Sequence, residues 1–294
     1  MKIKIAAITD VGKDRENNED AFIICPDLGK QEWDKNLTSS YVPVSEYGSI
    51  AIVADGMGGA NAGEVASAIA TQTVKDTFTK ETVNNCIKNG LIDELLQKAV
   101  KKADEAIAKR MWEDPSTAGM GTTIVICWVI NDTAHIAWCG DSRCYLYHPV
   151  KGLKPLTKDH SYVQELIDKG EITEEESFAH PDSNIITRGL GDEIPDSTPE
   201  VVSQPLTPND LLLLCSDGLS GYCPNKAIEN VLSSHYTDIE ACRDQLLKLA
   251  LDAGGYDNVC IALASLIGDT QDKPAILSWG QKFMIRIKNL LKFQ

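Results

Sequence analysis

Aspartates end several of the most apolar stretches of this chain, and this repeated pattern constrains the fold more than any other feature. Strand-like runs stop at an acid in "AAITDVG", "IAIVADG", "LLLLCSDG" and "AWCGD", and in "GGYDNVCIAL" the acid precedes such a run; the five residues are Asp10, Asp55, Asp217, Asp141 and Asp257. A single Asp-Gly pair after a strand is usually a turn. Five together predict carboxylates that converge at one sheet edge, where protons or cations must neutralise them.

A glycine-rich segment follows Asp55 in "VADGMGGANAGE". Gly56, Gly58 and Gly59 carry no Cβ, so the backbone can come close to the acid, and a carbonyl such as that of Gly56 can act as a ligand. A site made only of oxygen ligands selects hard cations such as Mg²⁺ or Mn²⁺. The histidines and cysteines do not show zinc spacing, which disfavours zinc.

A second polar cluster, "DRENNEDAF", contains Arg15, Asn18, Glu19 and Asp20 directly before a strand-like run. An arginine beside a dinuclear metal site suits a phosphate, because its planar fork binds two oxygens at once. Taken alone, the cluster would be read as a solvated charged loop, which is the usual fate of such runs.

The order of the expected elements indicates an α+β fold with antiparallel sheets and helices packed outside them. Strands are expected at 2–9, 21–26 and 48–55, helices at 62–78 and 91–111, and then three strands at 122–130, 133–140 and 143–149. The short turns between these three strands predict an antiparallel meander. A helix at 161–170, a buried strand at 210–218, helices at about 224–234 and 238–253 and a last strand at 257–266 follow.

Composition bounds the class of protein. The chain has 294 residues, 43% hydrophobic and 24% charged, which predicts a globular core. A net charge of −15 argues against a nucleic-acid partner. No apolar run is long enough to span a bilayer, and "MKIKIAAITD" is not a signal peptide. Nine scattered cysteines without a CxxC pair indicate reduced core thiols and a cytoplasmic protein.

Eight motifs, in order, resemble those of the metal-dependent serine/threonine protein phosphatases of type 2C, the PPM family. They are "TDVGKDRENNEDA", "VADGMGGANAGEVAS", "GTTIVI", "AWCGDSRCYLY", "LTKDHS", "AHPDSNIITRGLG", "LLLCSDGLS" and "DNVCIAL". Each motif alone is weak to moderate evidence, but eight in order are strong. The similarity is greatest to bacterial members, in which Met follows Asp-Gly, as at Met57. It runs from about residue 3 to 266.

The resemblance implies a four-layer α-β-β-α sandwich, with two central antiparallel sheets flanked by helix pairs. This domain would occupy residues 1–267, with a mobile flap over the site at about 161–190. The stretch 29–48 is longer than the hairpin common in compact bacterial members, so we expect a surface insertion there.

The resemblance also implies a set of metal ligands, which in this chain are Asp20, Asp55, Gly56, Asp141, Asp217 and Asp257. Asp55 would bridge two ions, and Asp217 and Asp257 would complete the first site. Asp20, through water, and the Gly56 carbonyl would serve the second. The ions would be Mn²⁺ or Mg²⁺.

Two further residue roles follow from the family. Asp141 matches the position that, with Asp217, holds a third metal in bacterial members. Arg15 matches the arginine that binds the phosphate, and it would be a catalytic residue together with Asp55.

The implied reaction is hydrolysis of phosphoserine and phosphothreonine in proteins. A metal-bridged hydroxide would attack phosphorus in line, without a phosphoenzyme. The partners would be phosphorylated proteins and a cognate Ser/Thr kinase, and the protein would be a monomer. The histidine that is a candidate general acid in many eukaryotic members is replaced by Met57, and a histidine found after "GMGG" in some bacterial members is Ala60. His160 and His180 remain candidates, although a structural or flap role is preferred for both.

Three other functions stay open. A non-catalytic relative would bind a phosphoprotein, but the loss of metal aspartates that marks such relatives is not seen here. A regulatory phosphatase dedicated to one partner usually carries an added sensor domain, and the sequence shows none. A general phosphomonoesterase for small molecules is the third.

The C-terminal segment differs from the acidic body. Residues 268–274 suggest a linker, and 278–294 suggest a basic amphipathic helix with Trp279, Phe283 and Ile287 on one face. The helix would bind a membrane surface or a partner protein, or dock on the domain itself, and docking is slightly preferred.

Overall fold

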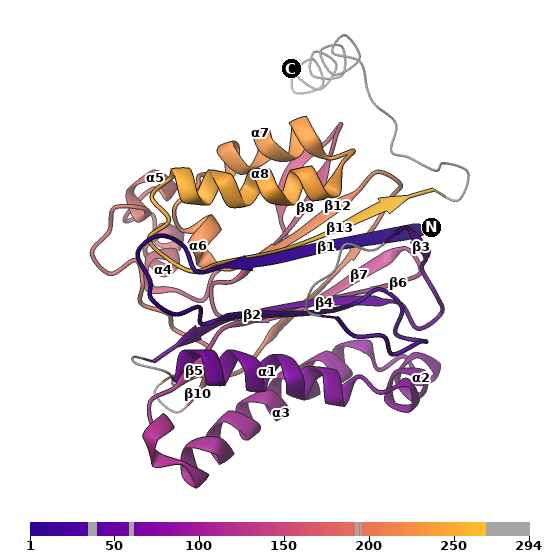
Figure 1. The fold of residues 1–294 in the computed structure, drawn as a ribbon, viewed down its shortest axis with the longest axis horizontal. Coiled ribbons are helices and arrows are strands. Elements are labelled where there is room, and N and C mark those ends of the chain that lie inside the picture. Colours follow the sequence, from indigo (N-terminus) through magenta and orange to yellow (C-terminus); the bar gives the residue numbers. More distant parts are fainter. Residues whose placement is uncertain (35–39, 59–61, 192–193, 195, 269–294) are drawn as a thin grey trace.

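Apolar runs of the sequence pair into two antiparallel sheets that lie face to face, with helices on both outer surfaces (Figure 1). The computed structural model describes residues 1–34, 40–58, 62–191, 194 and 196–268. The α+β class and the four-layer α-β-β-α sandwich are confirmed. The expected linker and tail helix lie beyond Gly268, outside the described residues.

The first sheet has six strands in the order β3-β1-β13-β12-β8-β9. Their bounds are Val42–Pro43, Lys2–Asp10, Val259–Ile267, Leu211–Cys215, Arg143–His148 and Gly152–Pro155. The second sheet has seven strands, in the order β10-β5-β4-β6-β7-β11, with β2 paired to β4. Their bounds are Leu190–Gly191, Gly121–Thr122, Ser49–Met57, Ile124–Ile130, Thr133–Cys139, Glu200–Pro205 and, for β2, Asp20–Cys25.

Helices cover each sheet on its outer side (Figure 1). On the second sheet these are α1, α2 and α3, which span Gly63–Thr77, Lys80–Asn89 and Ile92–Glu113. On the first sheet they are α7 and α8, which span Asn225–His235 and Ile239–Asp252. Short helices α4, α5 and α6, at Tyr162–Asp168, Glu174–Ser177 and Asp217–Ser220, lie together at one end of the sandwich, on the left of Figure 1, and a 3₁₀ turn follows α3 at Pro115–Thr117.

Helix α2 was not expected from the sequence, which predicted only two helices in this region. Its residues are mostly polar, and only Val83 and Cys86 are buried, so it lacks a long apolar stripe. Its ends are nevertheless well marked, because the Thr79 side chain accepts a hydrogen bond from the Thr82 N–H and Gly90 adopts φ 69°.

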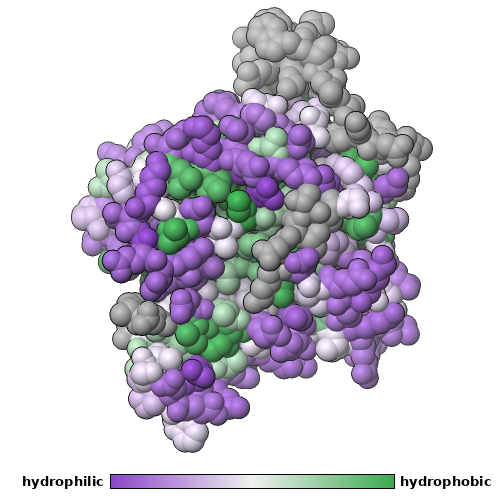
Figure 2. Space-filling view, in the orientation of Figure 1, coloured by the Kyte–Doolittle hydropathy of each residue, from purple (hydrophilic) through white to green (hydrophobic). Residues whose placement is uncertain are grey.

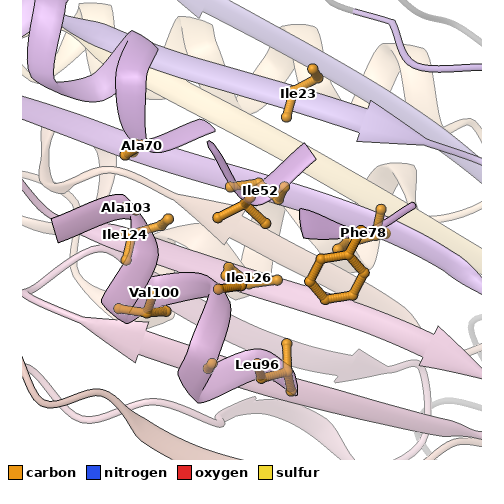
Figure 3. Close-up of a cluster of buried hydrophobic side chains, with 14 of the residues drawn as sticks. Ile23, Ile52, Ala70, Phe78, Leu96, Val100, Ala103, Ile124 and Ile126 are labelled. Atoms are coloured by element: carbon orange, nitrogen blue, oxygen red, sulfur yellow. The ribbon is translucent and has the colours of Figure 1, made fainter. Parts of the chain in front are cut away.

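Three apolar layers separate the four layers of secondary structure. In the layer between the second sheet and its helices, Ile52 and Ile126 face Ala70, Phe78 and Leu96 (Figure 3). The outer surface is different in kind, because the face drawn in Figure 2 is mostly hydrophilic, in keeping with the charged composition. All nine cysteines are buried and unpaired, as expected for reduced core thiols.

The expected meander is wrong in its third strand. Strands β6 and β7 form the predicted hairpin, but β8 belongs to the other sheet, where it pairs with β12 and β9. The chain crosses between the sheets at Gly140, whose φ is +117° and whose missing Cβ would lie 2.5 Å from the Thr123 Cβ. Only glycine fits this crossing. It places Asp141 between the two sheets.

The described part of 29–48 is tied into the domain and is more than a surface insertion. Strand β3 pairs with β1 at the sheet edge, and the Leu28 N–H donates to the Gly48 carbonyl at 2.9 Å. The Tyr41 hydroxyl hydrogen-bonds the Ser265 hydroxyl at 2.9 Å. Residues 35–39 of this stretch lie outside the described residues.

Candidate metal centre

Two of the proposed ligands lie side by side in the second sheet. Asp20 begins β2 and faces Asp55 of β4 directly in the antiparallel register, so their Cβ atoms are about 5 Å apart. The Asp55 carbonyl accepts hydrogen bonds from Thr122 Oγ1 and from the Thr123 N–H, each at 2.8 Å. Asp20 and Asp55 therefore belong to a hydrogen-bonded sheet and not to a free loop.

Two more carboxylates come from the first sheet. Asp217 follows the end of β12, and Asp257 precedes β13, which pairs antiparallel with β12, so both lie at the same sheet edge. Ser216 joins this edge to the second sheet, because its hydroxyl donates to Asp20 Oδ2 at 2.7 Å and accepts from the Cys260 N–H at 2.9 Å. The antiparallel register and Ser216 thus bring acids from both sheets together.

Asp141 belongs to the carboxylate cluster, whereas Asp10 does not. Asp141 is buried in the crossing between the sheets. The charge of Asp217 raises the pKa of Asp141, and the charge of Asp141 raises the pKa of Asp55. Asp10 instead accepts the Gly12 N–H through Oδ1 at 2.8 Å, within a local turn. The ordinary turn interpretation therefore holds for Asp10, and four of the five acids at strand ends, together with Asp20, form the cluster.

Burial and mutual repulsion raise the pKa values of the clustered acids. Burial is the largest cause for Asp20, Asp55, Asp141 and Asp217, and the neighbouring carboxylates raise these pKa values further. Asp20 and Asp217 are the neighbouring charges that most raise the pKa of Asp55, so the three carboxyl groups favour one another's protonated forms. Without a cation, the cluster must hold protons.

The donor set fits a hydrated hard cation. Asp20 Oδ1 is buried and has no hydrogen-bond partner, so it is an oxygen that lacks a positive neighbour. Within the described ranges, no three His, Cys, Asp or Glu side chains are arranged to hold one ion together. Mg²⁺ and Mn²⁺ need no such cage, because ions of this kind retain several waters and use one or two carboxylates each. Pairs of carboxylates beside the Gly56 backbone meet that need.

Gly56 brings its backbone close to neighbouring segments. A Cβ on Gly56 would lie 2.2 Å from the Gly63 carbonyl oxygen, so no other residue fits. Its N–H donates to the Glu19 carbonyl at 3.2 Å, which ties β4 to the loop before β2. Gly58 has φ +126°, a conformation that favours glycine, and Gly59 lies outside the described residues.

Arg15 lies beside the cluster. Its Nη2 donates to Asp257 Oδ2 at 2.8 Å, and this hydrogen bond is the main cause that raises the pKa of Arg15. The side chain is 53% exposed, so its remaining donors can reach a ligand from solvent. The structure thus brings Arg15 together with the carboxylates, as expected.

Asn258 positions the loop that carries Arg15, and sequence reasoning did not single it out. Its side chain accepts the Glu19 N–H at 2.8 Å and donates to the Val11 and Asn17 carbonyls, each at 2.9 Å. These bonds join residues 11–19 to the start of β13. The only sequence signal was its place directly after Asp257.

A cavity of about 430 Å³ opens beside the carboxylates. Arg15, Asp141, Asp217 and Asp257 are among the residues that line it. Residues of the expected flap also line it, among them Val163, Gln164 and Ile167 of α4, Ser177 of α5, and Phe178. The segment expected as a flap therefore forms a partly apolar wall of the space in which a substrate would lie.

The two histidines considered for proton transfer are engaged elsewhere. His160 is buried, its Nδ1 accepts the Gly140 N–H at 3.1 Å, and its ring stacks on Trp138. His180 packs against the Tyr162 ring. Neither is among the described residues that line the cavity. His160 instead holds the turn that carries Asp141, which agrees with the structural role preferred from sequence.

Comparison with known proteins identifies the family. Residues 39–253 match the family described as Protein phosphatase 2C. The chain is 35% identical over 255 residues to the serine/threonine phosphatase stp of Listeria innocua, covering 87% of this chain and 92% of that protein. It is 33% identical over 274 residues to the protein phosphatase PhpP of Streptococcus pneumoniae, covering 90% and 98%. The chain therefore belongs to the protein phosphatase 2C family.

Solved structures agree. The serine/threonine phosphatase Stp1 from Staphylococcus aureus superposes with a TM-score of 0.76 at 34% identity, covering 90% of this chain and 95% of that one. The catalytic domain of PstP in complex with two manganese ions gives a TM-score of 0.72 at 30% identity, covering 91% and 99%. The resemblance to bacterial members is confirmed, and the chain is a serine/threonine phosphatase of a metal-dependent family.

We expect the metal-free protein to lose stability as the pH rises. Burial and neighbouring charges raise the folded-state pKa of Asp20 to about 8 and that of Asp217 to about 6, above the unfolded value near 4. The folded state then binds more protons than the unfolded state, so the free energy of unfolding falls across this window. Thermal melts in EDTA between pH 6.5 and 8.5 should show a falling Tm.

The control is Asp20→Asn, which removes the group with the higher of these two pKa values and should flatten the slope. A Tm that stays constant or rises in the wild-type protein over this range would contradict the clustering of unneutralised acids.

Asn258→Ala should lower the free energy of unfolding by about 2–3 kcal/mol, because the buried Asn258 side chain makes three hydrogen bonds that the variant loses. Urea denaturation in EDTA measures this without any contribution from metal binding. The matched control is Asn89→Ala, whose amide bonds only within α2 and whose effect should stay within about 0.5 kcal/mol. Equal effects of the two substitutions would argue against the positioning role.

Proposed function

We propose that this phosphatase hydrolyses phosphoserine and phosphothreonine in proteins with Mn²⁺ or Mg²⁺ held by Asp20, Asp55, Gly56, Asp141, Asp217 and Asp257. The observation that carries the proposal is the cluster of buried acids with raised pKa values beside the exposed Arg15. Such a cluster is costly to a fold unless a cation or a proton neutralises it. Acids with raised pKa values that line a cavity are typical of functional sites, which explains why the fold keeps this costly cluster.

The ligands divide between two neighbouring ions in the proposal. Asp55 is shared, which the influence of both Asp20 and Asp217 on its pKa supports. Asp217 and Asp257 complete one site, where bound water would stand between the ion and at least one of the three carboxylates, because no three such side chains of the described residues are arranged to hold one ion directly. The Gly56 carbonyl and Asp20 serve the other. Two hard cations held by these residues would lower the pKa of a bound water and neutralise charge on a phosphoryl group.

A third ion would be held by Asp141 and Asp217. The charge of Asp217 is the largest cause, after burial, that raises the pKa of Asp141, which supports their closeness. The Gly140 turn and His160 fix the position of Asp141.

Arg15 binds the phosphoryl oxygens of the substrate in this proposal. Its ion pair with Asp257 orients the guanidinium and leaves donors of the fork free for a second acceptor. The nine cysteines are buried, which supports a reaction without a cysteine nucleophile. We also infer that a cognate Ser/Thr kinase supplies the substrates, that the catalytic domain spans 1–267 and that the protein is a monomer.

A non-catalytic phosphoprotein-binding relative is the alternative. Such a protein would not need metal ions for its function, so it would not need to keep a costly cluster of buried acids. The carboxylates retained in this chain therefore favour the enzyme over the binding protein. A regulatory role for one dedicated partner is compatible with the same site. The cavity wall formed by α4 and α5 favours a peptide over a free small phosphoester, because an extended chain can contact that wall.

Asp55→Asn should lower Mn²⁺-dependent hydrolysis of p-nitrophenyl phosphate about 1,000-fold, the scale of losing one main electrostatic group. It should also abolish the rise in Tm that Mn²⁺ causes. The metal-free variant at pH 8 should unfold at a higher temperature than the metal-free wild-type protein, because a buried group whose folded-state pKa is raised loses stability as the pH rises, and asparagine does not titrate.

Asp76→Asn is the matched control, since Asp76 is exposed on α1, and it should change none of these quantities. An Asp55→Asn protein that keeps both activity and the Mn²⁺ response would remove Asp55 from the proposed site.

Arg15→Ala should raise KM for a phosphothreonine peptide about 10- to 100-fold, the value of a charge-assisted hydrogen-bonding contact, with a smaller change in kcat. Steady-state release of phosphate measures both constants. Arg110→Ala removes an exposed arginine of α3 that pairs with Asp114 and should leave KM as it is. An unchanged KM in the Arg15 variant would exclude the phosphate contact.

A further inference from the structure

Two exposed tyrosines contact each other beside the cavity, and one of them, Tyr222, lines it. Tyr222 follows α6 and is 39% exposed, and Tyr256 precedes β13 and is 55% exposed. Their ring centroids are 5.7 Å apart at an interplanar angle of 46°. Large exposed apolar or aromatic side chains are few among the described residues, and these two pair with each other instead of packing inward.

The pair is continuous with the candidate catalytic site. Tyr222 lines the same cavity as Arg15, Asp217 and Asp257. Tyr256 is the residue directly before Asp257, whose carboxylate holds Arg15 at 2.8 Å. A group bound by Arg15 therefore lies next to the two rings.

The backbone holds Tyr256 in place. Gly254 adopts φ +131°, and a Cβ there would lie 2.1 Å from the ring of Tyr256, so the ring packs directly on the glycine backbone. Tyrosine has only two side-chain torsions, and a ring fixed before binding loses little entropy when a ligand arrives. The aromatic surface is thus formed in advance.

Charges of both signs surround the rings, so charge does not select the ligand. Lys13 and Arg15 lie on neighbouring segments, and Asp14 and Asp257 act on Tyr222 as negative charges. The property that distinguishes this spot is exposed aromatic area, and aromatic faces of this kind bind apolar side chains.

We propose that Tyr222 and Tyr256 form a platform that receives an apolar side chain of the substrate protein within two residues of the phosphorylated serine or threonine. The proposal rests on the proposed function, since it needs the phosphate to bind at Arg15. It makes the platform a determinant of substrate sequence. Val163 and Phe178, which also line the cavity, then contact the rest of the peptide.

The test uses phosphothreonine peptides with alanine at every flanking position. Leucine, arginine or glutamate replaces alanine at each of the two positions before and after the phosphothreonine, and kcat/KM is measured with Mn²⁺. For the wild-type protein, leucine at one of these positions should raise kcat/KM about tenfold over alanine, the scale of burying part of an aliphatic side chain on an aromatic ring.

The variants Tyr222→Ala and Tyr256→Ala should each reduce this leucine-to-alanine ratio towards one. Tyr256→Phe keeps the ring and should keep the ratio. Trp112→Ala removes an aromatic residue that is 83% exposed on α3 and should also keep it. Because each ratio compares two substrates on the same protein, a loss of folded enzyme cancels.

Three results would overturn the platform: no leucine preference in the wild-type protein, a preference that survives both alanine variants, or a preference for arginine over leucine. In each case hydrolysis of the peptides would leave the proposed function standing. If no peptide is hydrolysed, the proposed function fails, and calorimetric Kd values for the same peptides decide the platform. A leucine preference in Kd that the alanine variants lose supports it, and equal Kd values overturn it.

Discussion

The repulsion between buried carboxylates is the constraint on which the rest of this structure depends. Acids from both sheets meet at one edge, and burial raises the pKa of Asp20, Asp55, Asp141 and Asp217. The fold tolerates this because the surrounding sheet is held by specific hydrogen bonds, such as that from Ser216 to Asp20. The same arrangement that costs stability without a cation creates the affinity for one.

The remaining features of the site follow from this edge. Asn258 fixes the loop of Arg15 to the strand that follows Asp257, so the proposed phosphate-binding group and the proposed ligands share one support. The chain crosses between sheets at Gly140, which carries Asp141 to the same place. The acids, residues of α4 and α5, and Tyr222 all line the same cavity.

Most strands and most acids of the candidate site were predictable from the sequence, because an apolar run that ends on aspartate indicates both the end of a strand and a buried acid. The strands β1, β2, β4, β6, β7, β12 and β13 lie where they were expected. The placement of β8 in the other sheet was not predictable, because a short turn looks the same whether the chain reverses or crosses. Asn258 and Ser216 were missed because their roles depend on contacts more than 190 residues distant in sequence. Asp10 shared the sequence pattern of the cluster, but its turn lies outside it.

The most direct measurement is X-ray diffraction from crystals grown with Mn²⁺, with data collected at the manganese absorption edge. Anomalous peaks should lie between Asp55 and Asp217 with Asp257, and between Asp55 and the Gly56 carbonyl on the side of Asp20. A further peak against Asp141 and Asp217 is expected at the third position. A map without peaks at this edge, or with peaks only elsewhere on the protein, would contradict the claim that these acids converge to hold cations.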